Sequence, residues 1–479
     1  MPSRNLPTRV LLAAAVAAVL AVLLVPLAAS ATTAATPRHP FLTAIGYTQV
    51  SAPDQPLAFD RVKKAGAFGA RVTLYWPTIA PTRPKEPTNP ADPAYSWSAS
   101  DGEIKRIAAR GLSPLVMVYG TPKWAEAASG GAGAAPTTAA LAAFTKAAVA
   151  RYSGDSQALP RVRYWQLWAE PNIDRLLSPQ FSGSTPVAAG IYRAMVNVFA
   201  PAVHAVPGNI VIAGGLAPFA HTGKALTAAP LRFMRAMLCM SAAANPRPTC
   251  AAKTSFDIWA IHPYTNGSPW HKALNRDDVS IPEIPQMEKL VQAAVSAGHV
   301  VGAKPVRYWV TEFSWDSNPP VSFGVPPQLE AQWVSEAFYR MWSFKIELVT
   351  WLSLRDVTGA PAGLYFGGSS FADDRPKPAL AAFRFPFVAY PQKGRVLVWG
   401  RTPDSKAATV TIQRKSGSAW KSAATVKADR FGVFTSVLRT SPKGVLRARV
   451  ASGSASLAFA VKAPKDVALR MPALGGGRR

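Results

Sequence analysis

The sequence has few of the residues that metal centres and redox sites use. Among 479 residues there are only two cysteines and six histidines. Two cysteines without nearby histidines make a poor zinc site. No H-E-x-x-H, P-loop or G-x-S-x-G motif occurs. We therefore expect no bound metal and no cofactor, and the best-known nucleophilic serine and zinc hydrolases are disfavoured.

Acidic residues are also scarce, with 26 Asp and Glu against 53 Lys and Arg and a net charge of +27. The surplus is greatest in residues 386–479, where 18 basic and 3 acidic residues leave +15. Such a surplus is compatible with general solubility, with an acidic polymer or with an anionic cell surface as partner. A nucleic acid partner is disfavoured, because no helix-turn-helix, zinc-finger or RNA-binding signature appears.

Only one long apolar run is present, at residues 10–27, and Arg4 and Arg9 precede it. With the small residues at 29–31 it predicts a signal peptide over residues 1–31. A disordered lead, residues 32–40, would follow. The alternative is an uncleaved membrane anchor, since the run approaches the ~20 residues that span a bilayer. We therefore expect a secreted protein, or one held at the cell envelope.

In an exported protein the two cysteines, Cys239 and Cys250, are expected to form a local disulfide that closes one loop.

From residue 42 onward, short apolar runs alternate with helical patterns, which is typical of repeated βα units. Eight such units over residues 41–385 predict an α/β fold, a (β/α)₈ TIM barrel. A doubly wound open sheet is the alternative, but no G-x-G-x-x-G follows the first strand. The expected strands are 43–50, 70–76, 112–119, 162–168, 209–215, 256–262, 306–312 and 347–353. The expected helices are 60–68, 100–110, 138–152, 191–206, 285–297, 329–344 and 377–383.

After residue 386 the pattern changes to short runs of alternating apolar and polar residues, separated by Gly, Ser, Pro and Asp. This pattern predicts a small all-β sandwich domain over residues 386–465. Such a module either binds carbohydrate or cell wall, or packs on the barrel. A basic disordered tail, residues 466–479, would follow. The expected strands of the sandwich are 395–399, 409–413, 432–437 and 445–450.

Two of the barrel strands end in a glutamate. Glu170 closes the fourth strand and is followed by Pro171, which cannot continue a ladder, and Glu312 closes the seventh. Residues at the carboxyl ends of barrel strands converge on one mouth. Two unrelated surface glutamates are the alternative to a functional pair. Retaining glycosidases use two carboxyl groups about 5–5.5 Å apart, so the sequence predicts a carboxylate pair for glycoside cleavage.

Three further polar residues lie on or just after strands. Arg71, inside the second strand, forms either a structural salt bridge or a contact that keeps a catalytic carboxylate ionised. His262 follows the sixth strand and is either a structural residue or a contact to substrate or nucleophile. Tyr264 lies two residues further on, where its hydroxyl can hydrogen-bond Glu312.

Trp124, Trp315 and Trp351 also lie at or after strand ends. Buried tryptophan is usually part of a core, but several at one mouth suggest platforms on which sugar rings stack.

These residues resemble the retaining glycoside hydrolases of clan A, over roughly residues 42–388 and closest to the family 39 β-xylosidase-like and family 5 cellulase-like branches. The segment 168–172, W-A-E-P-N, resembles the clan's W-N-E-P-N acid/base motif, and 309–313, W-V-T-E-F, resembles its nucleophile strand. Arg71, the H-P-Y at 262–264, the T-P-K-W-A at 121–125 and Trp351 also match clan positions.

The resemblance implies double displacement without metal or cofactor, with Glu312 as nucleophile and Glu170 as acid/base. Arg71 and Tyr264 would position Glu312. Trp351 would form the floor of the −1 subsite. Asn172 is expected among the substrate-binding residues. The implied partner is an oligo- or polysaccharide, anionic if the positive charge reflects it, and we expect a monomer.

One position departs from the clan's pattern: Ala169 replaces the asparagine that contacts the sugar 2-hydroxyl. Hydrogen bonds to that hydroxyl strengthen in the transition state. The alternative function is therefore a catalytically weak, glycan-binding protein of the cell surface on a glycosidase fold.

Overall fold

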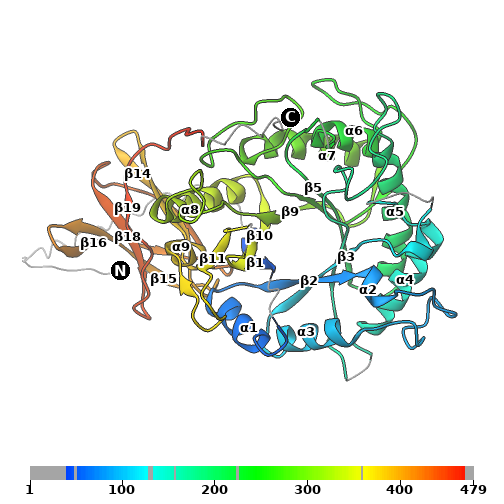
Figure 1. Ribbon diagram of the computed structural model, residues 1–479. Coiled ribbons are helices and arrows are strands. Elements are labelled where there is room, and N and C mark those ends of the chain that lie inside the picture. The colour runs from blue at the N-terminus through cyan, green and yellow to red at the C-terminus, as the bar shows by residue number, and fades with distance from the viewer. Residues whose placement is uncertain are drawn as a thin grey trace, which may run out of the picture.

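The computed structural model describes residues 39–47, 51–127, 133–155, 158–222, 226–357 and 360–469. Eight parallel strands close into a barrel in the order β1-β2-β3-β4-β5-β7-β9-β10, and β10 pairs back with β1 (Figure 1). The predicted TIM barrel is therefore confirmed, and the open-sheet alternative is wrong. These strands are β1 (Leu42–Tyr47), β2 (Gly69–Tyr75), β3 (Ser113–Tyr119), β4 (Tyr164–Leu167), β5 (Ile210–Leu216), β7 (Ile258–Ile261), β9 (Arg307–Phe313) and β10 (Ile346–Arg355). The predicted signal peptide and all but the last two residues of the lead lie outside the described residues.

Helices surround the barrel, and six of them have proline at one of their first two positions, where its missing N–H costs no helical bond. The first helix starts at Gln55 and not at the predicted residue 60, because Pro56 presets the helical φ near its start. None of the helices in the described ranges is long and apolar enough to cross a membrane. The helices are α1 (Gln55–Lys64), α2 (Trp76–Ile79), α3 (Ser98–Ala108), α4 (Thr138–Arg151), α5 (Val187–His204), α6 (Pro230–Leu238), α7 (Ile284–Ser296), α8 (Pro327–Ser343) and α9 (Pro378–Arg384).

Four short strands and two helices of the barrel region were not predicted. The helices are the four-residue α2, which directly follows β2, and α6, whose buried side chains include Phe233 and Met234. The strands β11 (Gly363–Phe366) and β12 (Arg375–Pro376) extend the sheet beyond β10. The two-residue strands β6 (Thr254–Ser255) and β8 (Val300–Val301) pair outside the barrel.

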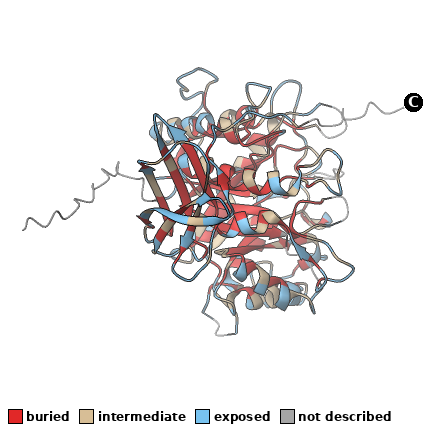
Figure 2. Cartoon of the chain, turned by 90° about the vertical axis from the view of Figure 1, so that its left-hand side faces the viewer, coloured by how far each residue is buried: buried red, intermediate tan, exposed pale blue. Residues whose placement is uncertain are grey.

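The core has two parts. A small cluster fills the barrel interior, and a much larger one lies between the strands and the surrounding helices. Figure 2 shows the resulting pattern, in which buried strands occupy the centre and exposed residues lie on loops and outer helix faces. The interior cluster consists of Ala44, Leu115, Ile212, Ile258, Ala260, Trp309 and Leu348. A filled interior leaves chemistry to the barrel's mouth.

The chain after residue 386 forms two antiparallel sheets, as in a small β-sandwich, with strand orders β13-β14-β17 and β16-β15-β18-β19. All four predicted strands are present, and β13, β16 and β19 are additional. The additional β16 was missed because most of its side chains are exposed and give no alternation. The bounds are β13 (Phe387–Gln392), β14 (Arg395–Arg401), β15 (Thr409–Ser416), β16 (Ala419–Lys427), β17 (Val433–Leu438), β18 (Val445–Val450) and β19 (Phe459–Ala460).

This sandwich packs on the barrel. The fully buried Arg401 donates hydrogen bonds to the Phe41 carbonyl, to the Thr43 hydroxyl and to the Phe383 carbonyl of α9, at 3.3, 3.1 and 3.0 Å. The Trp399 ring lies 5.7 Å from the ring of Phe41. A buried guanidinium with three acceptors fixes the two parts to each other.

Residues 466–469 return to the barrel, although the sequence placed them in a disordered tail. The Ser268 N–H donates to the Val467 carbonyl at 2.7 Å, and the Leu469 N–H donates to the Asn266 carbonyl at 2.8 Å. A ring nitrogen of His271 lies 2.7 Å from the Asp466 carboxylate. The folded part of the chain therefore extends to residue 469.

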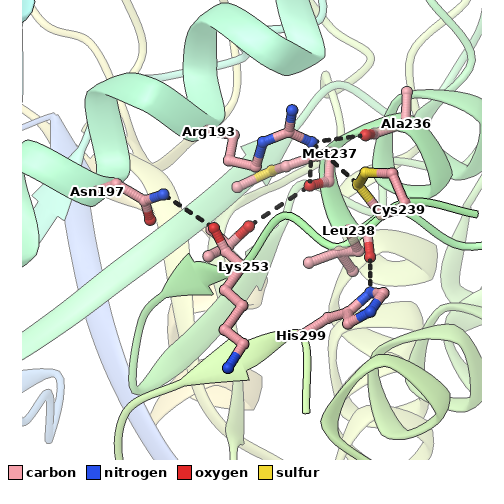
Figure 3. Close-up of a disulfide and its surroundings, with 10 residues drawn as sticks. Arg193, Asn197, Ala236, Met237, Leu238, Cys239, Lys253 and His299 are labelled. Atoms are coloured by element: carbon pink, nitrogen blue, oxygen red, sulfur yellow. Dashed lines mark hydrogen bonds between the residues drawn. A yellow bond between two sulfur atoms is a disulfide. The ribbon is translucent and has the colours of Figure 1, made fainter. Parts of the chain in front are cut away.

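The two cysteines form a disulfide that ties the end of α6 to residue 250. Cys239 is 3% exposed and adopts a left-handed conformation that ends the helix. Arg193 of α5 donates to the carbonyls of Ala236 and Met237, and its guanidinium lies 3.4 Å from the Cys239 sulfur (Figure 3). The disulfide therefore closes the loop that follows α6, and Arg193 ties the end of α6 to α5.

Candidate functional site

The two predicted glutamates lie together at the barrel's mouth. One carboxylate oxygen of Glu170, one of Glu312 and a ring nitrogen of His262 all lie within 4.8 Å of one another. Arg71 from β2 and Tyr264 from the loop after β7 bond directly to Glu312. Four barrel strands therefore bring these five predicted residues into one cluster.

A β-bulge aims Glu312 into the barrel. Val310 of β9 pairs with Val349 of β10, but Phe313 pairs with Trp351, so three steps along β9 match two along β10. In a regular strand consecutive side chains point to opposite faces. The extra residue allows both Thr311 and Glu312 to contact groups of the barrel interior, Thr311 through His262 and Glu312 through Arg71.

The backbone that carries Glu170 is strained. Trp168 and Glu170 have φ angles of 67° and 45°, a region that residues other than glycine rarely adopt. Hydrogen bonds hold this turn: the Trp168 N–H donates to Val118 at 2.8 Å and the Glu170 N–H donates to Gly215 at 2.9 Å. Such strain clusters at functional sites, where surrounding structure fixes a side chain in position.

Glu312 is held in its ionised form. Arg71 donates to one carboxylate oxygen at 3.2 Å and Tyr264 donates to the other at 2.9 Å. Burial alone would raise the pKa of Glu312, but the charges of His262 and Arg71 and the hydrogen bonds from Tyr264 and Arg71 outweigh it and lower this pKa. Burial and the two nearby carboxylates raise the pKa of Tyr264, which stays a donor.

Glu170 depends on His262. The ring Nδ1 lies 3.1 Å from a Glu170 oxygen and Nε2 lies 3.2 Å from the Thr311 hydroxyl, so a protonated ring donates to both. His262 is fully buried. It therefore positions Glu170, which agrees with the structural role that the sequence left open beside a contact with substrate or nucleophile.

Glu170, His262 and Glu312 are also residue types that bind divalent cations. Both oxygens of Glu312 already accept hydrogen bonds, however, and one donor is the cationic Arg71. A second cation beside this guanidinium would be repelled in a site of low dielectric. The residues therefore do not fit a metal site, and they fit a carboxylate pair.

The sequence analysis missed Gly215, which makes room for the cluster. Its φ is +62°, and a Cβ there would lie 2.9 Å from Gln166 Nε2 and 3.3 Å from His262 Nε2. It is the extra residue of a second bulge, since Gly214 and Leu216 of β5 pair with consecutive residues of β7. Two adjacent glycines inside a strand pattern were the available signal.

We expect Gly215→Ala to lower activity at least tenfold and to reduce the free energy of unfolding by about 1–3 kcal/mol. The added methyl group must displace His262 or Gln166, and the backbone of the alanine must keep a positive φ. Glycoside turnover and thermal unfolding measure the two effects. Gly190→Ala in α5, where a Cβ meets no atom within 4 Å, is the control and should stabilise the helix slightly. Equal behaviour of the two variants would contradict this role of Gly215.

Two of the three predicted tryptophans are buried and do not form a sugar platform. Trp315 is 4% exposed and Trp351 is fully buried, and their indole nitrogens donate to the carbonyls of Gly267 and Ala362. Trp124 is half-buried and donates to Ala80.

The expected role of Trp351 as a subsite floor is wrong for a reason of strand geometry. Its neighbours Leu348 and Thr350 face the barrel interior. The Trp351 ring lies on the other side of β10, 6.5 Å from Phe383 of α9.

Two tyrosines at strand ends add aromatic surface, one exposed and one half-buried. Tyr75 and Tyr119 are the last residues of β2 and β3, and their stacked rings lie 6.0 Å apart. Tyr75 is 44% exposed. A Cβ at Gly120 would lie 2.6 Å from the Tyr75 ring, so this glycine permits the close approach. Aromatic residues that end two barrel strands were the signal in the sequence.

Asn172 has a structural role in place of the expected substrate contact. It is fully buried, and its amide donates to the carbonyls of Ala217 and Ala228 and accepts from the Ala217 N–H. Both amide protons are therefore used in tying the loop after β4 to the loop after β5.

No protein-family model matches the chain, and no curated protein matches it. Among solved structures, a family 39 glycoside hydrolase from Bacteroides cellulosilyticus WH2 is 15% identical, with 84% of this chain and 79% of that chain covered and a TM-score of 0.51. The chain shares this enzyme's fold. A monomeric β-xylosidase from Caulobacter crescentus CB15 is 14% identical, with 84% and 95% covered and a TM-score of 0.48. A family 30 endoxylanase from Clostridium papyrosolvens C71 is 12% identical, with 84% and 93% covered and a TM-score of 0.44.

Proposed function

We propose that this protein is a retaining glycoside hydrolase that cleaves β-linked glycosides, with Glu312 as nucleophile and Glu170 as acid/base. The observation that carries the proposal is the approach of one oxygen of each carboxylate to within 4.8 Å. Retaining enzymes hold the two carboxyl groups about 5–5.5 Å apart, whereas inverting enzymes need about 6.5–9.5 Å to admit a water between them.

In the first step the ionised Glu312 attacks the anomeric carbon while Glu170 gives its proton to the departing glycosidic oxygen. The carbon–oxygen bond to the leaving group breaks, and a glycosyl ester forms on Glu312. Arg71 and Tyr264 keep Glu312 deprotonated and oriented before the attack. His262 fixes the position of the Glu170 carboxyl.

In the second step Glu170, now a carboxylate, takes a proton from a water molecule. The water oxygen attacks the anomeric carbon from the face that the leaving group vacated, and the Glu312 ester bond breaks. Two inversions give net retention, and both glutamates return to their starting protonation states.

Export to the cell surface by the N-terminal segment, action on an oligo- or polysaccharide, and a monomeric state are parts of the same proposal. Exposed Tyr75 at the mouth supports a carbohydrate partner, because sugar rings stack on aromatic faces.

The test is covalent trapping with a 2-deoxy-2-fluoro glycoside, chosen after a screen of chromogenic β-glycosides and polysaccharides. We expect the peptide that contains Glu312 to gain the mass of one fluorosugar, and product NMR to show retained anomeric configuration. Inverted product, or a label on another residue, would overturn the assignment.

The second candidate function is glycan binding with little turnover, and Ala169 favours it. An alanine supplies no hydrogen bond to the sugar 2-hydroxyl, a contact that strengthens in the transition state. This candidate predicts affinity for acidic polysaccharide that falls with added salt, and no label on Glu312 in the same trapping experiment.

A further inference from the structure

A cavity of about 710 Å³ lies among the segments that follow β9, β10 and β11. Two of these segments leave the carboxyl ends of the barrel strands β9 and β10, and the first begins two residues after Glu312. The third follows β11, which is parallel to β10 and extends the same sheet. The cavity therefore belongs to the same face of the barrel as the carboxylate pair. The lining residues that matter for its chemistry are Arg355, Asp356, Phe366, Gly367, Gly368 and Arg375.

The cavity wall is positively charged. Its one acidic residue, Asp356, is paired with the buried Lys377 at 2.6 Å. Arg355 is paired with Asp374 at 2.8 Å, but this carboxylate also serves Arg61, at 3.0 Å. The exposed Arg375 has no carboxylate within salt-bridge distance among the described residues. The wall therefore includes one arginine without a carboxylate partner among the described residues, Arg375, and a second, Arg355, that shares its carboxylate with Arg61.

The remaining lining residues suit a sugar ring. The Arg375 guanidinium lies 5.8 Å from the centroid of the Phe366 ring, so a cation and an apolar face adjoin. A Cβ at Gly367 or Gly368 would lie 2.8 Å from Asp356 or 2.7 Å from Asp373, so glycine at both positions allows the wall to pack closely. Guanidinium groups bind carboxylate and sulfate in bidentate geometry, and aromatic rings stack on sugars.

We propose that this cavity is a subsite for an acidic sugar unit, carrying carboxylate or sulfate, of the polysaccharide on which the carboxylate pair acts. The inference rests on the proposed function, and it names the substrate class of the same face. The net charge of +27 supports the proposal, since it would attract an anionic polymer to the protein.

The experiment is titration calorimetry at low salt, on a Glu312→Gln background so that no ligand is consumed. The ligands are a hexamer of galacturonic acid, a sulfated hexasaccharide and neutral xylohexaose. We expect Arg375→Glu to weaken binding of an acidic hexamer at least about tenfold, as loss of a charge-assisted contact does, and to leave xylohexaose binding unchanged.

Arg430→Glu is the matched control, because Arg430 is also exposed, and its guanidinium lies 4.7 Å from the ring of Phe431 on the sandwich. This control should change affinity less than twofold. Equal losses in the two variants, or equal affinities for the acidic and neutral hexamers, would overturn the proposal.

Binding does not require turnover, so the two proposals fail separately. If Glu312 is labelled by the fluorosugar but Arg375→Glu does not weaken binding of acidic hexamers, only the subsite proposal is wrong. If acidic hexamers bind in a way that depends on Arg375 but Glu312 is not labelled, the acidic-glycan site stands and the hydrolase proposal is wrong.

Discussion

We expect Glu312→Gln to abolish the proposed glycoside cleavage, with kcat reduced on the order of 10⁴-fold or more. The amide is a poor nucleophile and cannot form the glycosyl ester. The fold is expected to persist, because the amide oxygen still accepts a hydrogen bond from Arg71 or Tyr264. Release of a chromogenic aglycone, with thermal unfolding measured alongside, tests both statements.

Glu170→Gln is expected to act differently. Loss of the general acid costs about 10²–10⁴-fold with poor leaving groups, and much less with activated aryl glycosides, which leave without protonation. The ester on Glu312 then accumulates, because no base activates water.

Glu288→Gln on the outer face of α7 is the control for both glutamates, since its partner is the exposed Lys345, and it should leave turnover unchanged. Wild-type rates in the Glu312 variant, or the same dependence on leaving group in both glutamate variants, would contradict the assigned roles.

The barrel, and the convergence of Glu170 and Glu312, were predictable because strand ends in a closed parallel barrel meet at one face. Arg71 and Tyr264 followed from the same logic, since each sits on or just after a barrel strand. The order and the ends of the strands therefore predict which residues lie near the mouth, even where the loop structures are unknown.

Side-chain direction was not predictable, because it depends on strand register. One extra residue in β9 brings Glu312 into the barrel, while Trp351 on β10 faces the helices. A period-2 pattern carries no mark of such a bulge when both faces of a strand are buried. For the same reason the sequence could not show that Trp351 faces away from the barrel interior. The bulge at Gly215 differs, because the adjacent glycines at 214 and 215 were a visible signal.

A second large effect is expected from Glu330 of α8, which lies outside the carboxylate pair. The side chain is fully buried, and neither carboxylate oxygen has a hydrogen-bond partner among the described residues. Burial raises the pKa of Glu330 to about 8; the charge of Lys377 opposes this, and Asp356 and Asp316 add to it. At neutral pH the folded protein therefore holds this carboxyl largely protonated.

The pKa of Glu330 is thus higher in the folded chain than in the unfolded one, where it is near 4.5. Unfolding then releases this proton at any pH between the two values. The stability of the protein is greatest, as far as this group is concerned, below pH 4.5 and falls as pH rises toward about 8. The full loss, reached above pH 8, is at most on the order of 5 kcal/mol.

Glu330→Gln keeps the shape and removes the titration. We expect its unfolding temperature to match the wild type near pH 4 and to exceed it increasingly up to pH 9, measured by calorimetry across that range. Glu288→Gln, at an ion pair on the outer face of α7, is the control for the loss of one glutamate. Parallel curves for the wild type and Glu330→Gln would show that the carboxyl ionises freely in the folded protein. Lys377, whose charge acts on Glu330, is also paired with Asp356 at the cavity wall. A Glu330→Gln variant that is more stable but binds acidic hexamers as the wild type does would show that the stability effect is independent of ligand binding.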